Sequence, residues 1–166
     1  MWPMQPSGDK FRITEPILKQ LGAKPALRAE FIKFFELCYI DEIPLFLFAV
    51  SEFRGRPTLD EFAKVYNEYV KLGSPKQVNI SDKRRVPLDV FMAAHKNAVG
   101  NTEGSHNFPL PVPRAKFDEC FADMLNFANL SMIRDYPKVF AELEKFLQQN
   151  VIDKPIGGKL WNMHHA

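Results

Sequence analysis

The chain has 166 residues, of which 46% are hydrophobic and 25% are charged. This length is most simply one domain with a real hydrophobic core, and the composition is that of a folded protein rather than a disordered chain. The formal net charge of +2 is too small to indicate a nucleic-acid partner, since the basic residues are scattered among acidic ones.

Helical periodicity runs through the first half of the chain. Residues 16–26, PILKQLGAKPA, predict a short helix closed by Gly22. Residues 27–39 place their apolar side chains at helical spacing, which predicts an amphipathic helix: Leu27, Phe31, Phe34, Phe35 and Cys38. A third helix, about 42–53, is apolar nearly all round. It should therefore lie at the centre of the fold, with Phe46 and either Phe48 or Leu47 nearly fully buried.

Capping residues mark several helix starts. Asp41 is a candidate N-cap for the helix over 42–53. Thr58 is a candidate N-cap for the helix that begins LDEFAKVYNEYVKL, and Glu61, three residues later, would complete a capping box. Pro137 suits the first turn of a helix over about 137–149.

The remaining segments are also helical or irregular. We expect helices near 81–98 and over about 114–130, joined by a polar, proline-bearing loop over 99–113. No segment of useful length alternates like a strand. The sequence therefore predicts an all-α fold, a compact bundle of about eight to nine helices. It would span residues 15–150, between an N-terminal extension (1–14) and a C-terminal tail (151–166) that we expect to be flexible.

The usual sequence motifs of catalysis are missing. There is no glycine-rich phosphate loop, no C-x-x-C pair and no H-E-x-x-H. His164 and His165 are adjacent histidines of a kind that binds metal only weakly. Asp118 and Glu119 open a helix, where carboxylates complement the helix dipole. We therefore expect a binding module with no catalytic residue, no cofactor and no metal.

Cys38 and Cys120 indicate the compartment. Two cysteines give no disulfide framework, and both lie on apolar faces, so we expect inert core thiols in a reduced, cytoplasmic protein. No apolar run approaches the roughly 18–20 residues that a membrane span requires. The first ten residues lack the apolar segment of a secretory signal.

Asn79 stands between two β-branched apolar residues, Val78 and Ile80, just before a helix start. A buried core disfavours a bare amide, so this side chain needs a partner. Two explanations remain open. Asn79 could cap the following helix, with Ser81 or Asp82 sharing the task, or it could face a binding partner.

Five segments, taken in order, resemble the regulator of G-protein signalling (RGS) domain family. They are ILKQLGAKPALRAEFIKFFELCYIDEIPLFLFAVSEF, LDEFAKVYNEYV, KQVNIS, FDECFADMLNF and DYPKVF. KQVNIS matches the family's V-N-I/L turn, and DYPKVF is similar to its Y-P-R-F. The resemblance covers roughly residues 15–149, and its weight comes from the order of the five segments rather than from any one of them.

The resemblance implies a set of partner-binding residues. Asn79 takes the place of the asparagine that contacts the switch regions of a G-protein α subunit. Tyr39 and Glu42 match the acidic contact loop, and Phe127 stands where an aliphatic residue often touches the partner, although it could be core. Ile43 departs from the family, which commonly has asparagine at that point.

The segment after Phe127 departs further from the family pattern. Arg134 stands where the family has an acid, Asp135 could substitute after a shift, and Lys138 takes the basic position after the proline. Since Phe127 and Phe140 both favour the core, we expect the residues between them to form a loop. This loop should bring Lys138 with Asp135 or Arg134 to the same surface as Tyr39, Glu42 and Asn79.

The resemblance implies a GTPase-activating protein for heterotrimeric G-protein α subunits. Such a domain supplies no catalytic group and binds the switch regions best in their transition-state conformation. It would be cytoplasmic, and recruitment to the plasma membrane through the partner stays open. Two alternatives also remain: an RGS-like scaffold that binds a protein without accelerating GTP hydrolysis, and an unrelated helical bundle with a ligand pocket.

Overall fold

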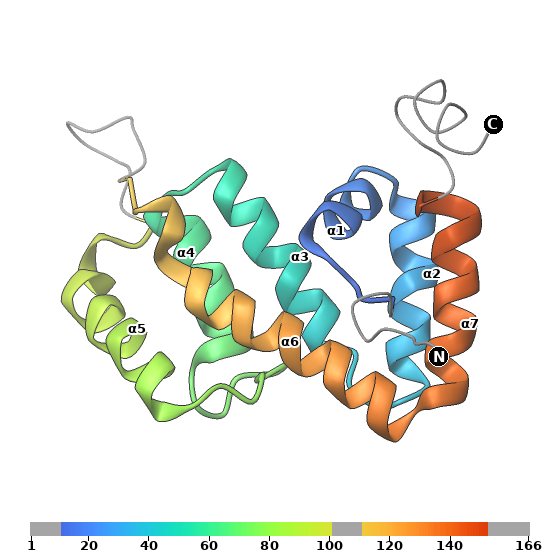
Figure 1. Ribbon diagram of the computed structural model, residues 1–166. Coiled ribbons are helices and arrows are strands. Elements are labelled where there is room, and N and C mark those ends of the chain that lie inside the picture. The colour runs from blue at the N-terminus through green and yellow to red at the C-terminus, as the bar shows by residue number, and fades with distance from the viewer. Residues whose placement is uncertain (1–10, 101–110, 153–166) are drawn as a thin grey trace. The chain divides into compact units, whose positions relative to one another are not determined.

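Helices form most of the protein in the computed structural model, which describes residues 11–100 and 111–152 (Figure 1). The α-helices are α1 (Glu15–Gly22), α2 (Pro25–Glu36), α3 (Glu42–Gly55), α4 (Leu59–Val65), α5 (Asp82–His95), α6 (Asp118–Asp135) and α7 (Pro137–Leu147). Shorter turns follow or precede them: the π-helical η2 (Tyr66–Val70) and η5 (Gln148–Ile152), and the 3-10 η3 (Lys96–Ala98) and η4 (Arg114–Phe117). Within these residues the one β-type pairing is an isolated bridge between Thr58 and Pro111. The all-α prediction is confirmed.

The internal contacts of the chain divide it into two compact units. Unit 1 consists of residues 1–38 and 129–166, and unit 2 consists of residues 39–128. The helix α6 contributes its first eleven residues, 118–128, to unit 2 and its last seven to unit 1. The expected bundle over 15–150 thus comprises parts of both units. Most of the expected tail, 153–166, lies outside the described residues.

The core of unit 2 is built on α3 and a cluster of aromatic rings. Phe46, Leu47 and Phe48 are 0%, 2% and 5% exposed, which confirms that this helix is buried. The Phe62 ring stacks on the Phe117 ring with centroids 5.0 Å apart, and the Phe53 ring meets Phe117 edge-on at 5.1 Å. These contacts join α3, α4 and η4 in one core.

In unit 1, α2 packs against both α1 and α7, and the last turns of α6 belong to the same unit (Figure 1). The Phe34 and Phe146 rings lie 5.5 Å apart between α2 and α7. Asn129 is a buried polar residue, and its side-chain amide forms hydrogen bonds with both the backbone N–H and the backbone carbonyl of Ile13. The Ile13 N–H donates to Oδ1 at 2.7 Å, and Nδ2 donates to the Ile13 carbonyl at 2.9 Å. Residues 11–14, expected as part of an extension, therefore pack on the helices of unit 1.

The α6–α7 junction corrects one sequence prediction. We expected residues 129–138 to form a loop, but α6 continues through Asp135 and α7 begins at Pro137. Asn129, Ser131 and Met132 are buried, so the inward face of the helix simply continues past Phe127. Residues 129–135 therefore lengthen α6 rather than form a loop, because the added turns still bury side chains.

Thr58 caps α4 as predicted, although the capping box is only half formed. The Thr58 hydroxyl accepts the Glu61 N–H at 3.2 Å. The Glu61 carboxylate pairs with Lys64 at 2.9 Å. Asp41 occupies the N-cap position of α3 but makes no side-chain cap bond.

Thr58→Ala should lower the free energy of unfolding by about 1 kcal/mol, the usual cost of losing a helix N-cap. Glu61→Gln should cost less than half of that, because its partner Lys64 is an exposed side chain. Urea unfolding followed by circular dichroism measures both values. Equal losses in the two variants would contradict this assignment of the cap.

Candidate protein-binding site

The Asn79 turn, residues 76–81, alternates between the core and the surface. Val78 is 1% exposed and Ile80 is 8% exposed, whereas Asn79 between them is exposed. Two buried apolar side chains therefore hold the turn against unit 2 and direct the amide outward. This arrangement is the one that the sequence suggested for a partner-facing asparagine.

The turn is also bonded back to the π-helical η2. The Lys76 N–H donates to the Glu68 carbonyl and the Val78 N–H to the Tyr69 carbonyl, each at 2.9 Å. Gly73 begins this return with φ +80°, a backbone conformation that glycine adopts without strain. The start of the Asn79 turn is thus fixed by hydrogen bonds of its own backbone.

The capping role belongs to Ser81 rather than to Asn79. The Ser81 hydroxyl accepts the Arg84 N–H at 3.4 Å, and Ser81 occupies the N-cap position of α5. In the part of the chain that the structure describes, the Asn79 side chain makes no hydrogen bond. The exposed Asn79 amide is therefore available for hydrogen bonds to a binding partner.

The second predicted patch is the Tyr39–Glu42 corner, which leads into α3. Tyr39 is 88% exposed and has φ +59°. This left-handed backbone conformation is energetically unfavourable for a residue with a bulky side chain. Glu42 is partly exposed in the first turn of α3. Ile43 is 2% exposed and belongs to the core, so it offers no surface contact where the family has asparagine.

Contacts through Tyr69 place this corner and the Asn79 turn at the same end of unit 2. Phe46, one helical turn after Glu42, meets the Tyr69 ring edge-on at 5.8 Å. The Tyr69 carbonyl in turn accepts the Val78 N–H. In Figure 1 the first turn of α3 and the segment between η2 and α5 lie at the lower end of unit 2. The exposed side chains of Tyr39 and Asn79 thus belong to neighbouring segments.

The remaining predicted residues are divided between the units. Phe127 lies on the part of α6 in unit 2 and is 37% exposed. Arg134, Asp135 and Lys138 belong to unit 1 and are exposed. The Arg134 Nε donates to Asp135 at 3.0 Å, and this hydrogen bond lowers the pKa of the Asp135 carboxyl. That these three residues share a surface with Asn79 stays a prediction.

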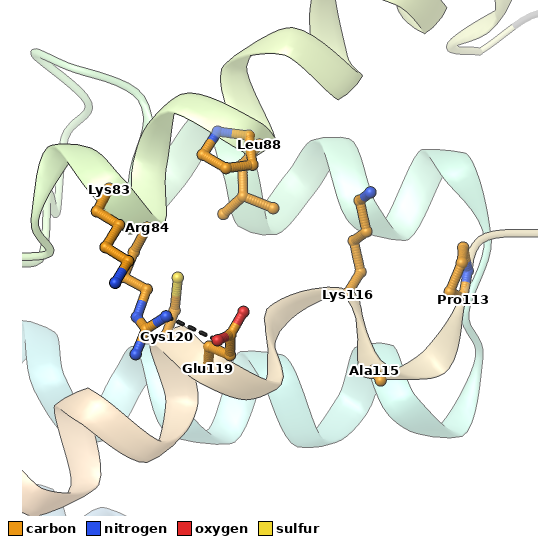
Figure 2. A pocket seen from close by; sticks show the side chains of 9 residues that line it. Lys83, Arg84, Leu88, Pro113, Ala115, Lys116, Glu119 and Cys120 are labelled. Carbon is orange, nitrogen blue, oxygen red and sulfur yellow. Dashed lines mark hydrogen bonds and ion pairs between the residues drawn. The ribbon is translucent and has the colours of Figure 1, made fainter.

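A pocket of about 310 Å³ lies between α5 and the start of α6, within unit 2 (Figure 2). The Arg84 guanidinium at its edge donates to Glu119 at 2.7 Å and to Asp123 at 2.8 Å. The Lys116 ammonium lies 4.0 Å from the centre of the Phe91 ring. These charged groups bond to neighbours in the fold, so the arrangement acts as a bridge between α5 and α6.

Cys120 lines this pocket but is only 3% exposed, and Cys38 is buried in unit 1. Burial raises the pKa of both thiols, that of Cys120 to about 11. Since the thiolate is the reactive form, both side chains are the inert core thiols that the sequence predicted.

We expect both thiols to react slowly with an aromatic disulfide reagent at pH 8 and rapidly once the protein is unfolded in guanidinium. The fold favours the neutral Cys120 thiol, because its pKa rises from 9.0 to about 11. The stability that the protein gains from keeping the Cys120 thiol neutral is therefore fully present below pH 9 and is lost as the pH rises toward 11. Rapid labelling of two thiols in the native protein would contradict the burial.

Sequence reasoning missed a polar cluster beside the Asn79 turn: Tyr66, Asp82, Arg85 and Asp89. The Tyr66 hydroxyl donates to Asp89 Oδ1 at 2.7 Å, and Arg85 pairs with Asp82 at 2.8 Å and with Asp89 at 3.4 Å. The i,i+3 and i,i+4 spacings of the acids around Arg85 were visible in the sequence. The burial of Arg85, 9% exposed, was not.

Comparisons with known proteins leave the family open. No protein-family model matches the chain, and no curated protein matches it. Among the described residues, no three His, Cys, Asp or Glu side chains are grouped to hold a metal ion. None of the helices in those residues is long and apolar enough to cross a membrane.

Proposed function

We propose that this protein is an RGS-like GTPase-activating protein for heterotrimeric G-protein α subunits. The observation that carries the proposal is the exposed Asn79 amide, which buried Val78 and Ile80 on either side direct toward solvent. Asn79 is not needed to cap α5, because the Ser81 hydroxyl does so. The exposed Tyr39 and the partly exposed Glu42, at the same end of unit 2, support the proposal. The five RGS-like segments of the sequence supply the class of partner.

The proposed mechanism needs no catalytic group from this chain. The α subunit carries its own arginine and its water-positioning glutamine. A domain that binds the switch regions more tightly in the transition-state geometry than in the ground state lowers the barrier by that difference. A tenfold acceleration requires about 1.4 kcal/mol, which a few hydrogen bonds at a protein interface can supply.

The direct test is single-turnover GTP hydrolysis by purified α subunits of each class, with and without this protein. We expect at least tenfold acceleration for one class. We also expect tighter binding to the α subunit with GDP and aluminium fluoride, a mimic of the transition state, than to the same subunit with a non-hydrolysable GTP analogue. Equal binding to the two forms together with unchanged hydrolysis would refute the proposed activity.

The buried Ile43 favours a second candidate, a scaffold that binds an α subunit or another protein without accelerating hydrolysis. One polar contact of the family's acidic loop is missing at this position, since Ile43 packs in the core. The same assay separates the candidates, because a scaffold binds both nucleotide states equally, or neither if its partner is another protein, and leaves the hydrolysis rate unchanged. Either protein would act in the cytoplasm, and recruitment to the plasma membrane through an α-subunit partner stays open.

A further inference from the structure

Two routes connect the Asn79 turn with the π-helical turn η2. The first is the pair of backbone hydrogen bonds from Lys76 and Val78 to the carbonyls of Glu68 and Tyr69. The second runs through side chains, from the Tyr66 hydroxyl on η2 to Asp89 on α5 at 2.7 Å. The turn and the first half of α5 are therefore tied to η2 on both sides of Asn79.

Arg85 extends the second route to the beginning of α5. Its guanidinium pairs with Asp89 Oδ2 at 3.4 Å and with Asp82, three residues after Asn79, at 2.8 Å. The largely buried charge of Arg85 is stabilised by these two carboxylates. Burial and the hydrogen bond to Asp89 raise the pKa of Tyr66 to about 12, so its hydroxyl remains a donor at physiological pH.

We propose that Tyr66, Arg85 and Asp89 are positioning residues that hold the Asn79 turn in the single conformation its partner recognises. This inference rests on the proposed function. The three side chains do not touch the partner. They reduce the entropy that the turn loses on binding, since a preorganised loop binds more tightly than a flexible one. A π-helical turn, often found at functional sites, provides both anchors.

The fold does not depend on the Tyr66 hydroxyl alone. The helix α5 keeps the buried side chain of Leu88, 3% exposed, and the Ser81 cap. It also keeps the bridge from Arg84 to Glu119 on α6, drawn in Figure 2, and the second bond from Arg84 to Asp123. Removing one hydroxyl should therefore loosen the turn while α5 stays in place.

The test compares Tyr66→Phe with Tyr69→Phe, a matched control that removes a hydroxyl from the same π-helical turn. We expect the Val78 amide hydrogen to exchange about twofold to tenfold faster in Tyr66→Phe, the range for loss of one part-buried hydrogen bond. Exchange of the α3 amides should not change. In the GTPase assay, the concentration of Tyr66→Phe that gives half-maximal acceleration should rise by a similar factor, with the rate at saturation close to wild type. Tyr69→Phe should behave as wild type in both measurements.

Unchanged Val78 exchange in Tyr66→Phe would overturn the inference, as would a lower saturating rate without a change in the half-maximal concentration. If Tyr66→Phe does not fold, Asp89→Asn keeps an acceptor for the phenol, removes the ion pair with Arg85 and is judged by the same two measurements. If wild type does not accelerate hydrolysis, the proposed function fails. Val78 exchange then still decides whether the cluster holds the turn.

Discussion

Asn79→Ala should abolish most of the GTPase acceleration, by at least about tenfold, and leave the melting temperature within a few degrees of wild type. The amide is exposed and makes no hydrogen bond in the described part of the chain, so its removal costs the fold about 0.5 kcal/mol or less. Its proposed contact with the switch regions exists only in the complex. Single-turnover hydrolysis and thermal unfolding of the same preparation measure the two effects.

Asn97→Ala is the matched control for Asn79→Ala. Asn97 is another exposed asparagine of unit 2, on η3 at the opposite end of α5. The fourteen residues of α5 put about 20 Å between the two positions. This variant should keep full acceleration. If Asn79→Ala instead unfolds readily and retains its activity per folded molecule, the amide has a structural role and the binding assignment is wrong.

Phe62→Ala should produce the largest loss of stability, about 3–5 kcal/mol. Phe62 is 0% exposed, stacks on Phe117 at 5.0 Å and meets Phe91 edge-on at 4.9 Å. Truncation leaves a cavity where α4, α5 and η4 meet, and these rings cannot collapse into it without breaking their mutual contacts. The midpoint of guanidinium unfolding measures the loss.

Phe127→Ala removes the same side chain from a position that is 37% exposed, so it should cost less than half as much as Phe62→Ala. If Phe127 contacts the partner, this variant should weaken partner binding more than it lowers stability. A loss below about 1 kcal/mol for Phe62→Ala would show that the aromatic cluster is not the core of unit 2.

Local sequence pattern was sufficient for several features of the protein. The burial of α3 could be predicted because its apolar residues leave no polar stripe for solvent. The outward direction of Asn79 could be predicted because Val78 and Ile80 flank it and both favour the core. The Thr58 cap and the position of Pro137 in the first turn of α7 are also local, since each depends on a few neighbouring residues.

Other features depend on residues far apart in the chain. The continuation of α6 to Asp135 depends on tertiary structure. Asn129 can be a buried helical residue because its side chain forms a hydrogen bond with the backbone of Ile13, 116 residues away. The tertiary structure placed Ile43 in the core, where the family pattern suggested a contact residue. It also joined Tyr66 to Asp89 across the Asn79 turn. Sequence periodicity reports which face of a helix is apolar, but only the packed fold determines which polar side chains meet across it.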